Sequence, residues 1–156
     1  MKIHLNLGSN LGNSKALIGR AIARLAAMFP PGLMLLSDYV SSEPWGYDSP
    51  NHFLNRGILY ITDAVMHPED VLDITQAVET SVGENAPHRN PDGTYCDRLI
   101  DIDIIDIDGM CLSTQRLTLP HPRAPLRTFV TGPMAQLENQ LQEAEPSSRR
   151  ISSKCS

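Results

Sequence analysis

The sequence predicts an α+β fold in which helices pack on a largely antiparallel sheet. Three observations predict it: segments that alternate apolar and polar residues, segments whose apolar residues recur every three or four positions, and the order in which the two kinds follow each other. That order is strand, helix, strand, strand, helix, strand, with one more helix behind it. It is the order of the ferredoxin-like split βαβ sandwich.

The first predicted strand is Lys2–Leu7, in which every second residue is apolar. This alternation is typical of a strand with one buried face and one exposed face. The residues Gly8, Ser9 and Asn10 end it. In Ser14–Phe29 the apolar residues form a single helical stripe, so a helix is expected there, ended by the Pro-Pro-Gly that follows.

Two strands are predicted next, Leu33–Ser42 and Phe53–Thr62. The loop of about ten residues between them is longer than a hairpin needs, which suggests that it has a function. A second helix is expected at Pro68–Val82. Proline suits its first position, the acidic residues after it suit the positive helix end, and Gly83 suits its exit.

The second half of the chain begins with a polar loop, Glu84–Asp97, that has few apolar anchors and is expected to be mobile. A strand, Arg98–Asp108, follows and ends at an Asp-Gly turn. The last helix is expected at Arg127–Leu141. Residues 1–142 are therefore predicted to form one domain, and residues 143–156, which are polar and lack an apolar period, a disordered tail.

Composition excludes several classes of function. A net charge of −5 argues against a nucleic-acid partner, because such surfaces need clustered cations. No apolar run is long enough to span a bilayer, and the N-terminus lacks the pattern of a secretory signal, so no membrane partner and a cytoplasmic location are expected. The three cysteines have no metal-ligand spacing and are too few for a disulfide framework. We expect a monomer.

An acidic pair lies in the last predicted strand. Asp101 and Asp103 share one face of the strand and lie about 6–7 Å apart, while the isoleucines between and beside them point to the other face. Two such carboxylates suit Mg²⁺, which takes carboxylate oxygens together with waters and phosphates. The alternative is a solvent-facing strand that merely carries acids. Asp106 and Asp108 are expected on the opposite face, near a turn, without a catalytic role.

An aromatic cluster surrounds the loop between the second and third strands. It contains Trp45, Gly46 and Tyr47, and it continues with Phe53 and Asn55 on one face of a strand. A flat heteroaromatic ligand needs aromatic faces to stack on and an amide to pair with its edge. The alternative is that the rings simply fill the core.

A third cluster supplies cations. His121, Arg123 and Arg127 lie in a loop that leads into the last helix, with Phe129 just inside it. Guanidinium groups match phosphate oxygens well. The alternative is that they are ordinary surface residues.

Four ordered motifs closely resemble those of the 6-hydroxymethyl-7,8-dihydropterin pyrophosphokinases of folate biosynthesis. They are Gly8-Ser9-Asn10-Leu11-Gly12, Glu43-Pro44-Trp45-Gly46 with Phe53-Leu54-Asn55, Arg98-Leu99-Ile100-Asp101-Ile102-Asp103-Ile104, and Leu119-Pro120-His121-Pro122-Arg123 with Arg127 and Phe129. The resemblance covers residues 3–137. It implies transfer of pyrophosphate from ATP to a pterin alcohol, with two Mg²⁺ ions and with AMP as the second product.

The resemblance also implies a role for individual residues. The catalytic residues would be Arg98, Asp101, Asp103, His121 and Arg127, with Asp101 and Asp103 as the metal ligands. The pterin would bind to Trp45, Gly46, Phe53, Asn55, Tyr95 and Phe129. ATP, the co-substrate, would bind to Gln76, Glu79, Arg89, Arg98, Ile104, His121 and Arg127.

Two departures from the family pattern stand out. Glu84 stands where many members have arginine, and the tail lacks the apolar segment with which members commonly end. Arg89 is the loop's only arginine and its expected phosphate contact, and the loop itself is expected to close as a lid over both substrates. A rival interpretation of Glu84 is a catalytically impaired homologue or ligand-binding module. A metal-dependent nuclease is disfavoured by the acidic charge.

Overall fold

The computed structural model describes residues 1–84, 86–87 and 89–145. Its elements in chain order are β1 (Lys2–Ser9), α1 (Ser14–Met28), β2 (Gly32–Ser42), β3 (Phe53–Thr62), α2 (Pro68–Val82), β4 (Asp101–Ile107), β5 (Leu112–Ser113), β6 (Thr118–Leu119), a 3₁₀ turn η1 (Ala124–Leu126) and α3 (Thr128–Ala144). The short strands β5 and β6 form a small separate sheet that the sequence did not predict.

The main sheet has the order β2-β3-β1-β4, and every neighbouring pair in it is antiparallel. Strand β3 thus lies between β1 and β2, and β1 lies between β3 and β4. Each helical crossover therefore joins two strands that are separated by a third, which is the split βαβ arrangement. The predicted ferredoxin-like α+β fold is confirmed.

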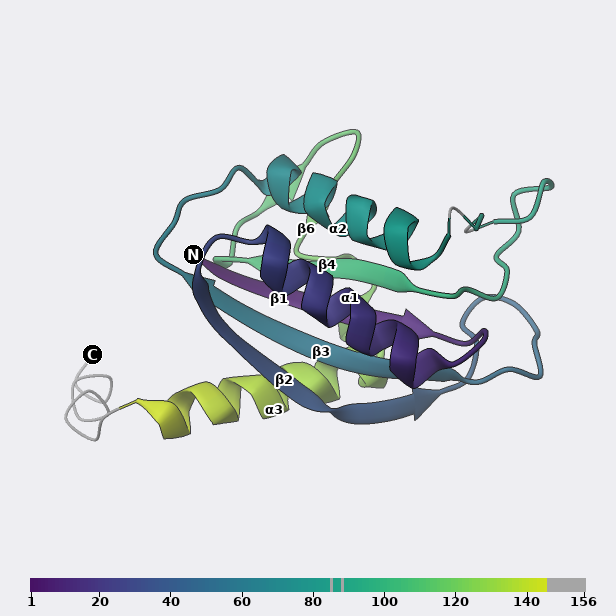
Figure 1. Cartoon of the computed structure of the whole chain (residues 1–156), viewed down its shortest axis with the longest axis horizontal. Coiled ribbons are helices and arrows are strands. Elements are labelled where there is room, and N and C mark those ends of the chain that lie inside the picture. Colours follow the sequence, from purple (N-terminus) through teal and green to yellow (C-terminus); the bar gives the residue numbers. More distant parts are fainter. Residues whose placement is uncertain (85, 88, 146–156) are drawn as a thin grey trace.

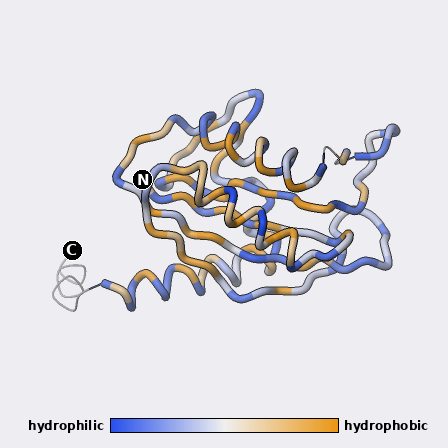
Figure 2. Tube along the Cα trace, viewed as in Figure 1, coloured by the Kyte–Doolittle hydropathy of each residue, from blue (hydrophilic) through white to orange (hydrophobic). Residues whose placement is uncertain are grey.

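Helices α1 and α2 lie side by side on one face of the sheet (Figure 1). The apolar residues of β1 and β4 point toward them, and Leu5, Ile18 and Val78 are among the side chains buried between the layers. Apolar residues are concentrated along the strands, whereas the segment between α2 and β4 is largely hydrophilic (Figure 2). This layer is the main hydrophobic core and holds the sheet rigid.

Helix α2 ends where the sequence predicted. Pro68 occupies its first turn with Glu69 and Asp70, and the N–H of Gly83 donates to the Glu79 carbonyl at its exit. His67 caps the first turn with its side chain. Caps of this kind satisfy backbone groups that have no partner within the helix.

Helix α3 covers the other face, against β2 and β3 (Figure 1). It comes very close at Gly57, where a Cβ atom would lie 2.8 Å from Pro133 and 3.1 Å from Leu137. The prediction that β1 is only half-buried is wrong, because His4 and Asn6 are also buried on this second face. The alternation in β1 therefore reflects two buried faces, an apolar one toward α1 and α2 and a polar one on the α3 side, and not exposure of one face to solvent.

Strand β4 differs from its prediction in two ways. It begins at Asp101, so residues 98–100 approach it as extended chain. A bulge then shifts the register against β1, so that Ile104 pairs with Leu5 but Asp106 with His4. Asp106 consequently shares the face of His4 and Asp103, and its predicted place on the opposite face is wrong.

The chain's last helix extends three residues beyond its predicted end, to Ala144, and so takes in the first two residues of the predicted tail. Glu145 follows as the C-cap of the helix, and residues 146–156 of that tail lie outside the described residues. Within the part of the chain that the structure covers, no helix is both long and apolar enough to cross a membrane.

Candidate active site

A cavity of about 310 Å³ opens on the α3 side of the sheet, between the end of β1, the loop after β2 and the start of α3. Helix α3 packs on β2 and β3 and leaves this part of the face uncovered. The lining residues are Asn6, Gly8, Ser42, Glu43, Trp45, Tyr47, Phe53, Asn55, Tyr95, Arg98, Asp101, Asp103, His121, Pro122, Arg123, Arg127 and Phe129.

Two carboxylates lie on one face of β4 inside this cavity. Asp101 and Asp103 are partly buried, while Ile102 and Ile104 point into the core on the other face. Both carboxylates are therefore less exposed than the alternative of a solvent-facing strand implies. The strand is anchored by an apolar underside and presents both acids to a cavity.

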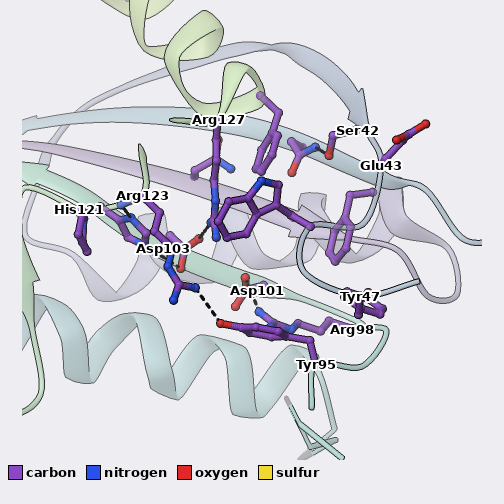
Figure 3. A pocket seen from close by; sticks show the side chains of 17 residues that line it. Ser42, Glu43, Tyr47, Tyr95, Arg98, Asp101, Asp103, His121, Arg123 and Arg127 are labelled. Carbon is purple, nitrogen blue, oxygen red and sulfur yellow. Dashed lines mark hydrogen bonds and ion pairs between the residues drawn. The ribbon is translucent and has the colours of Figure 1, made fainter. Parts of the chain in front are cut away.

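Cations surround the two carboxylates (Figure 3). Arg98 Nη1 lies 2.7 Å from Asp101 Oδ2, and Arg127 Nη1 lies 3.7 Å from Asp103 Oδ2. Both guanidinium groups also carry a buried Nε without a hydrogen-bond partner in the described structure. Unpaired buried donors of this kind are costly, so they suit a site that an anionic ligand completes.

His121 faces Asp103, with its Nε2 3.9 Å from Asp103 Oδ1. Its Nδ1 accepts a hydrogen bond from the backbone N–H of Arg123, which puts the imidazole proton on Nε2. Burial lowers the pKa of His121, and the charges of Arg127 and Arg123 lower it further. His121 is therefore neutral at pH 7 and offers one N–H donor to the cavity.

Aromatic rings form another wall. Trp45 is 41% exposed and lies under Arg127, with the guanidinium carbon 4.5 Å from the ring centroid. Arg127 also contacts the ring of Phe129 at 5.7 Å, and Phe53 lines the cavity from β3. The alternative that Trp45 and Phe53 fill the core is wrong, because both line this cavity and neither belongs to the buried apolar clusters.

Asn55 and Gly8 meet on neighbouring strands. Asn55 is almost fully buried, and its Nδ2 donates to the Val40 carbonyl and to Ser42 Oγ. A Cβ atom on Gly8 would lie 3.1 Å from Asn55 Oδ1 and 3.4 Å from the Phe53 ring. Glycine at position 8 thus keeps space beside the amide and the ring that the sequence assigned to the pterin.

Tyr95 joins the cavity to the loop after α2. Its hydroxyl accepts a hydrogen bond of 2.9 Å from Arg123 Nη1, and this hydrogen bond, together with the charge of the guanidinium, lowers the pKa of Tyr95. The Tyr95 ring also lies under Arg89, at 4.2 Å, and under Arg98, at 5.3 Å. Tyr95 is therefore held by arginines from three segments of the chain.

A smaller hollow of about 220 Å³ adjoins the first and shares Asp103, His121 and Pro122 with it. Its other lining residues are Leu72, Ile102, Ile104, Arg116, Leu117 and Thr118. Arg116 also contacts α2, with Nη2 2.6 Å from Asp73 Oδ1 and 3.3 Å from Gln76 Oε1. The two hollows thus meet at Asp103, whereas Asp101 lines the larger one alone.

Ten of the predicted site residues line the larger cavity, namely Trp45, Phe53, Asn55, Tyr95, Arg98, Asp101, Asp103, His121, Arg127 and Phe129, and Ile104 lines the smaller one. Four do not line either hollow. Gly46 packs on the Tyr95 ring, Gln76 reaches the smaller hollow only through Arg116, and Arg89 bonds to the Gly93 carbonyl within its own loop. Glu79 is the fourth.

Sequence reasoning assigned no role to several lining residues. Gly8 lies inside a quoted motif, and Tyr47 and Arg123 stand in the aromatic and cationic clusters, but the resemblance implied no role for any of the three. Asn6 was not predicted as a site residue, because the alternation in its strand placed it on a face expected to be exposed to solvent. Arg116 carries no local signal, since it stands in the turn between two very short strands.

Comparison with known proteins agrees with this geometry. The sequence profile of the 7,8-dihydro-6-hydroxymethylpterin-pyrophosphokinase family matches residues 4–139. The chain belongs to this family. A protein of Porphyromonas gingivalis, described as 2-amino-4-hydroxy-6-hydroxymethyldihydropteridine pyrophosphokinase, is 36% identical over 146 residues, which are 92% of this chain and 95% of the relative.

Other members of the pyrophosphokinase family carry the same description. The protein of Methylorubrum extorquens is 32% identical over 139 residues, or 87% of this chain and 82% of the relative. That of Bacillus subtilis is 28% identical over 140 residues, or 90% of this chain and 80% of the relative. The resemblance inferred from the four motifs is thus confirmed at the level of the family.

Proposed function

We propose that this chain transfers pyrophosphate from ATP to 6-hydroxymethyl-7,8-dihydropterin and releases AMP and the pterin diphosphate, a step of folate biosynthesis. The observation that carries the proposal is the acidic pair Asp101 and Asp103, which lines an aromatic-walled cavity, adjoins a second hollow at Asp103 and is flanked by the guanidinium groups of Arg98 and Arg127. One site with two compartments suits a reaction between two substrates.

The larger cavity is assigned to the pterin. Phe53, Phe129 and Trp45 offer ring faces for stacking, and Asn55 offers an amide for the ring's hydrogen-bonding edge. A cavity of about 310 Å³ is of the size that small-molecule sites have. Tyr95 belongs to this wall, and Gly46 would support it from outside the cavity, since a Cβ atom on Gly46 would lie 3.6 Å from the Tyr95 ring.

The smaller hollow is assigned to the nucleotide. Ile104 and the side chains beside it give an apolar surface for the base, and Gln76 and Glu79 lie on the adjoining helix. Arg98, His121 and Arg127 then point toward the triphosphate, which would lie along the acidic pair. Arg89 does not reach this site in the structure, so its predicted phosphate contact requires the loop to move.

The acidic pair suits magnesium. In the described part of the chain no three His, Cys, Asp or Glu side chains gather into a protein-only cage. Mg²⁺ usually takes one or two carboxylates and completes its octahedron with waters and substrate phosphates, which fits Asp101 and Asp103. We propose two such ions, which when bound neutralise and orient the triphosphate.

In this reaction the protein contributes the positioning of both substrates and charges that stabilise the phosphates. The pterin hydroxyl oxygen forms a bond to the β-phosphorus as the bond from that phosphorus to the oxygen bridging to the α-phosphate breaks. AMP leaves with that oxygen, and the hydroxyl proton is released to water. Arg98 and Arg127 stabilise negative charge on the phosphates, and the Nε2–H of His121 donates to a phosphate oxygen. Holding both substrates in line supplies much of the rate.

The decisive experiment mixes the purified chain with ATP, Mg²⁺ and 6-hydroxymethyl-7,8-dihydropterin. AMP and the pterin diphosphate should form in equal amounts, without ADP. Binding of both substrates without AMP would favour the rival, a catalytically impaired homologue, to which Glu84 points. A monomeric state and a cytoplasmic location stay predictions, and gel filtration with light scattering would test the first.

A further inference from the structure

Three connections meet at one carboxylate just outside the larger cavity. Asp97 Oδ1 accepts a hydrogen bond of 2.9 Å from Asn10 Nδ2 and one of 3.0 Å from the Tyr47 hydroxyl. Its Oδ2 accepts a third, of 2.6 Å, from Asn51 Nδ2. The donors come from the β1–α1 turn and from the middle and the end of the loop between β2 and β3, so a single side chain ties these segments together.

Asn10 extends this network to the residue after Asp97. Its backbone N–H donates to the Arg98 carbonyl at 3.0 Å, and the N–H of Arg98 donates to Asn10 Oδ1 at 2.7 Å. Asn10 Nδ2 also donates to the Tyr47 hydroxyl and to the Asn51 carbonyl. The end of β1 and the approach to β4 are therefore held in register with the β2–β3 loop.

The network positions residues that do line the cavity. Tyr47 is one of them, Trp45 lies two residues before it, and Arg98 holds Asp101 at 2.7 Å. Asp97 is not a lining residue itself. Any effect that it has on a ligand must therefore act through Tyr47, the loop or Arg98.

The carboxylate is suited to this task because it is ionised. Burial raises the pKa of Asp97, but the hydrogen bonds from Ser49, Asn51, Tyr47 and Asn10 lower it more, so the pKa ends below its usual range. Hydrogen bonds to an ionised acceptor are shorter and stronger than those between neutral groups. An uncharged side chain at this position would lose that advantage.

We propose that Asp97 is a positioning residue that fixes the β2–β3 loop over the cavity, so that the wall of Trp45 and Tyr47 is already formed when the pterin arrives. This inference rests on the assignment of the larger cavity to the pterin. A preformed wall saves the entropy of ordering the loop on binding. Loss of Asp97 should accordingly weaken pterin binding more than it lowers kcat, the turnover rate of the bound complex.

The first test needs no ligand. Trp45 is the only tryptophan of the chain, so its fluorescence reports the wall directly. In Asp97→Asn, an amide NH2 group would replace one carboxylate oxygen and would face donors that now bond to that oxygen. The loop should then be held less firmly, and acrylamide should quench the fluorescence of Trp45 more readily. The control is Asp48→Asn, which removes an exposed carboxylate from the same loop but not from the network. Equal quenching in wild type, Asp97→Asn and Asp48→Asn would overturn the proposal.

The second test measures affinity for 6-hydroxymethyl-7,8-dihydropterin in Asp97→Asn, in Tyr47→Phe, which loses only the hydroxyl, and in the double variant. Each single change should raise the pterin Kd about tenfold, as loss of a charge-assisted hydrogen bond does, and kcat should fall less than threefold. The double variant should be little worse than either, because both changes break one network. Multiplying effects, or a loss confined to kcat, would contradict the proposal.

The two tests separate this inference from the proposed function. A wild-type chain that fails to bind the pterin would remove the assignment of the cavity, yet the quenching comparison would still decide whether Asp97 orders the loop. Denaturation of each variant gives the remaining check. Asp97→Asn should keep a cooperative unfolding transition, and a weaker pterin affinity that merely followed a loss of the folded state would overturn the positioning role.

Discussion

At the scale of single residues, the site contains its own counter-ions. Arg98 pairs with Asp101, and Arg127 lies 3.7 Å from Asp103, which the neutral His121 faces at 3.9 Å. A magnesium–triphosphate complex carries both kinds of charge as well. Its metal cations can replace the arginines as partners of the carboxylates, and its phosphate anions can replace the carboxylates as partners of the arginines. Exchange of partners therefore lets the ligand enter without leaving a buried charge unpaired, which would be costly.

The acidic pair gives the first prediction. Asp101→Asn or Asp103→Asn should lower turnover about 10²-fold or more, because each removes one strong electrostatic contributor and a metal-ligand charge. Folding should be retained, since both side chains lie on the cavity face of β4 and outside the core. AMP formation at millimolar Mg²⁺ measures the effect.

A matched control is available on the same strand. Asp106 is a carboxylate whose Oδ2 accepts a hydrogen bond from the Gly109 N–H, and it does not line either hollow. Asp106→Asn should therefore turn over at nearly the wild-type rate. Near-wild-type activity of both cavity variants would remove the metal assignment.

Asn55 gives the second prediction. Asn55→Ala should weaken pterin binding by about 1–3 kcal/mol, because polar groups of the ring edge lose their partner, and should affect ATP binding less. The amide also holds Val40 and Ser42, so the cavity wall loosens as well. Calorimetry with each ligand separates the two sides of the site. Equal losses for ATP and pterin would contradict this division.

Local patterns identified much of the site but not all of it. Asp101 and Asp103 could be placed on one face because strand alternation is regular, and Phe53 and Asn55 for the same reason. Arg116 and Asn6 could not be placed in this way. The position of Arg116 depends on where two short strands end, and the burial of Asn6 depends on a helix that comes more than a hundred residues later. Such placement depends on tertiary packing, which no local period encodes.

At the scale of elements, strong periods and caps gave reliable boundaries. Strand β3 and helix α2 begin and end where predicted, because turn residues flank the first and Pro68 and Gly83 mark the second. The bulge in β4 was not foreseen, because one extra residue leaves an isoleucine-rich pattern almost unchanged. It moved Asp106 to the other face.

The seat of α3 gives the third prediction. Gly57→Ala should destabilise the protein by roughly 1–3 kcal/mol, because the added methyl group would lie 2.8 Å from Pro133 and has no room. It should also weaken ligand binding, since Phe129 stands in the first turn of the displaced helix. Chemical denaturation measures the first effect, and pterin titration the second.

The same helix supplies the control. Gly132 lies in α3 with no atom within 4 Å of an added Cβ. Gly132→Ala should therefore be neutral or stabilise the chain by about 0.5–1 kcal/mol, as glycine is unfavourable inside a helix. If both variants unfold alike, the close approach at Gly57 has no energetic weight.

The loop between α2 and β4 gives the fourth prediction. Its arginine, Arg89, now contacts Gly93 and the Tyr95 ring and lies outside both hollows, so a role in catalysis requires the loop to close. Amides from Arg89 to Cys96 should exchange quickly in the free protein and slowly with an ATP analogue, Mg²⁺ and pterin together. Arg89→Ala should slow turnover. Unchanged exchange combined with wild-type turnover of this variant would make the loop inert.

At the scale of the whole molecule, the two faces of the sheet divide the work. Helices α1 and α2 cover one face with the main core, and α3 covers only part of the other (Figure 1). The uncovered part carries the acidic pair and the cavity. A rigid sheet with an incomplete second layer thus provides a site whose floor is fixed and whose walls are loops.

The second layer also buries a histidine. His4 is 4% exposed on β1, under α3, and its Nε2 lies 3.2 Å from Glu138 Oε1. The contact is not an aligned hydrogen bond, because neither ring nitrogen has a hydrogen-bond partner in the described structure. Burial lowers the pKa of His4, and the opposing pull of Glu138 does not restore it. His4 is therefore neutral in the folded protein at pH 7.

The free energy of unfolding should consequently fall as the pH drops below about 6.5. In that range His4 binds a proton in the unfolded chain but stays neutral in the folded protein. His4 alone should lower the free energy of unfolding by up to about 1.4 kcal/mol per pH unit, and its effect should level off once the pH passes the lowered pKa. His121 contributes in the same direction because its pKa is also lowered. Denaturant titrations at pH 7.5 and 5.5 test this above the range in which the aspartates titrate. His4→Gln, made together with His121→Gln, should flatten the dependence, whereas His52→Gln at an exposed site should keep it. An equal loss of stability in the wild type and the double variant would show that neither histidine is responsible.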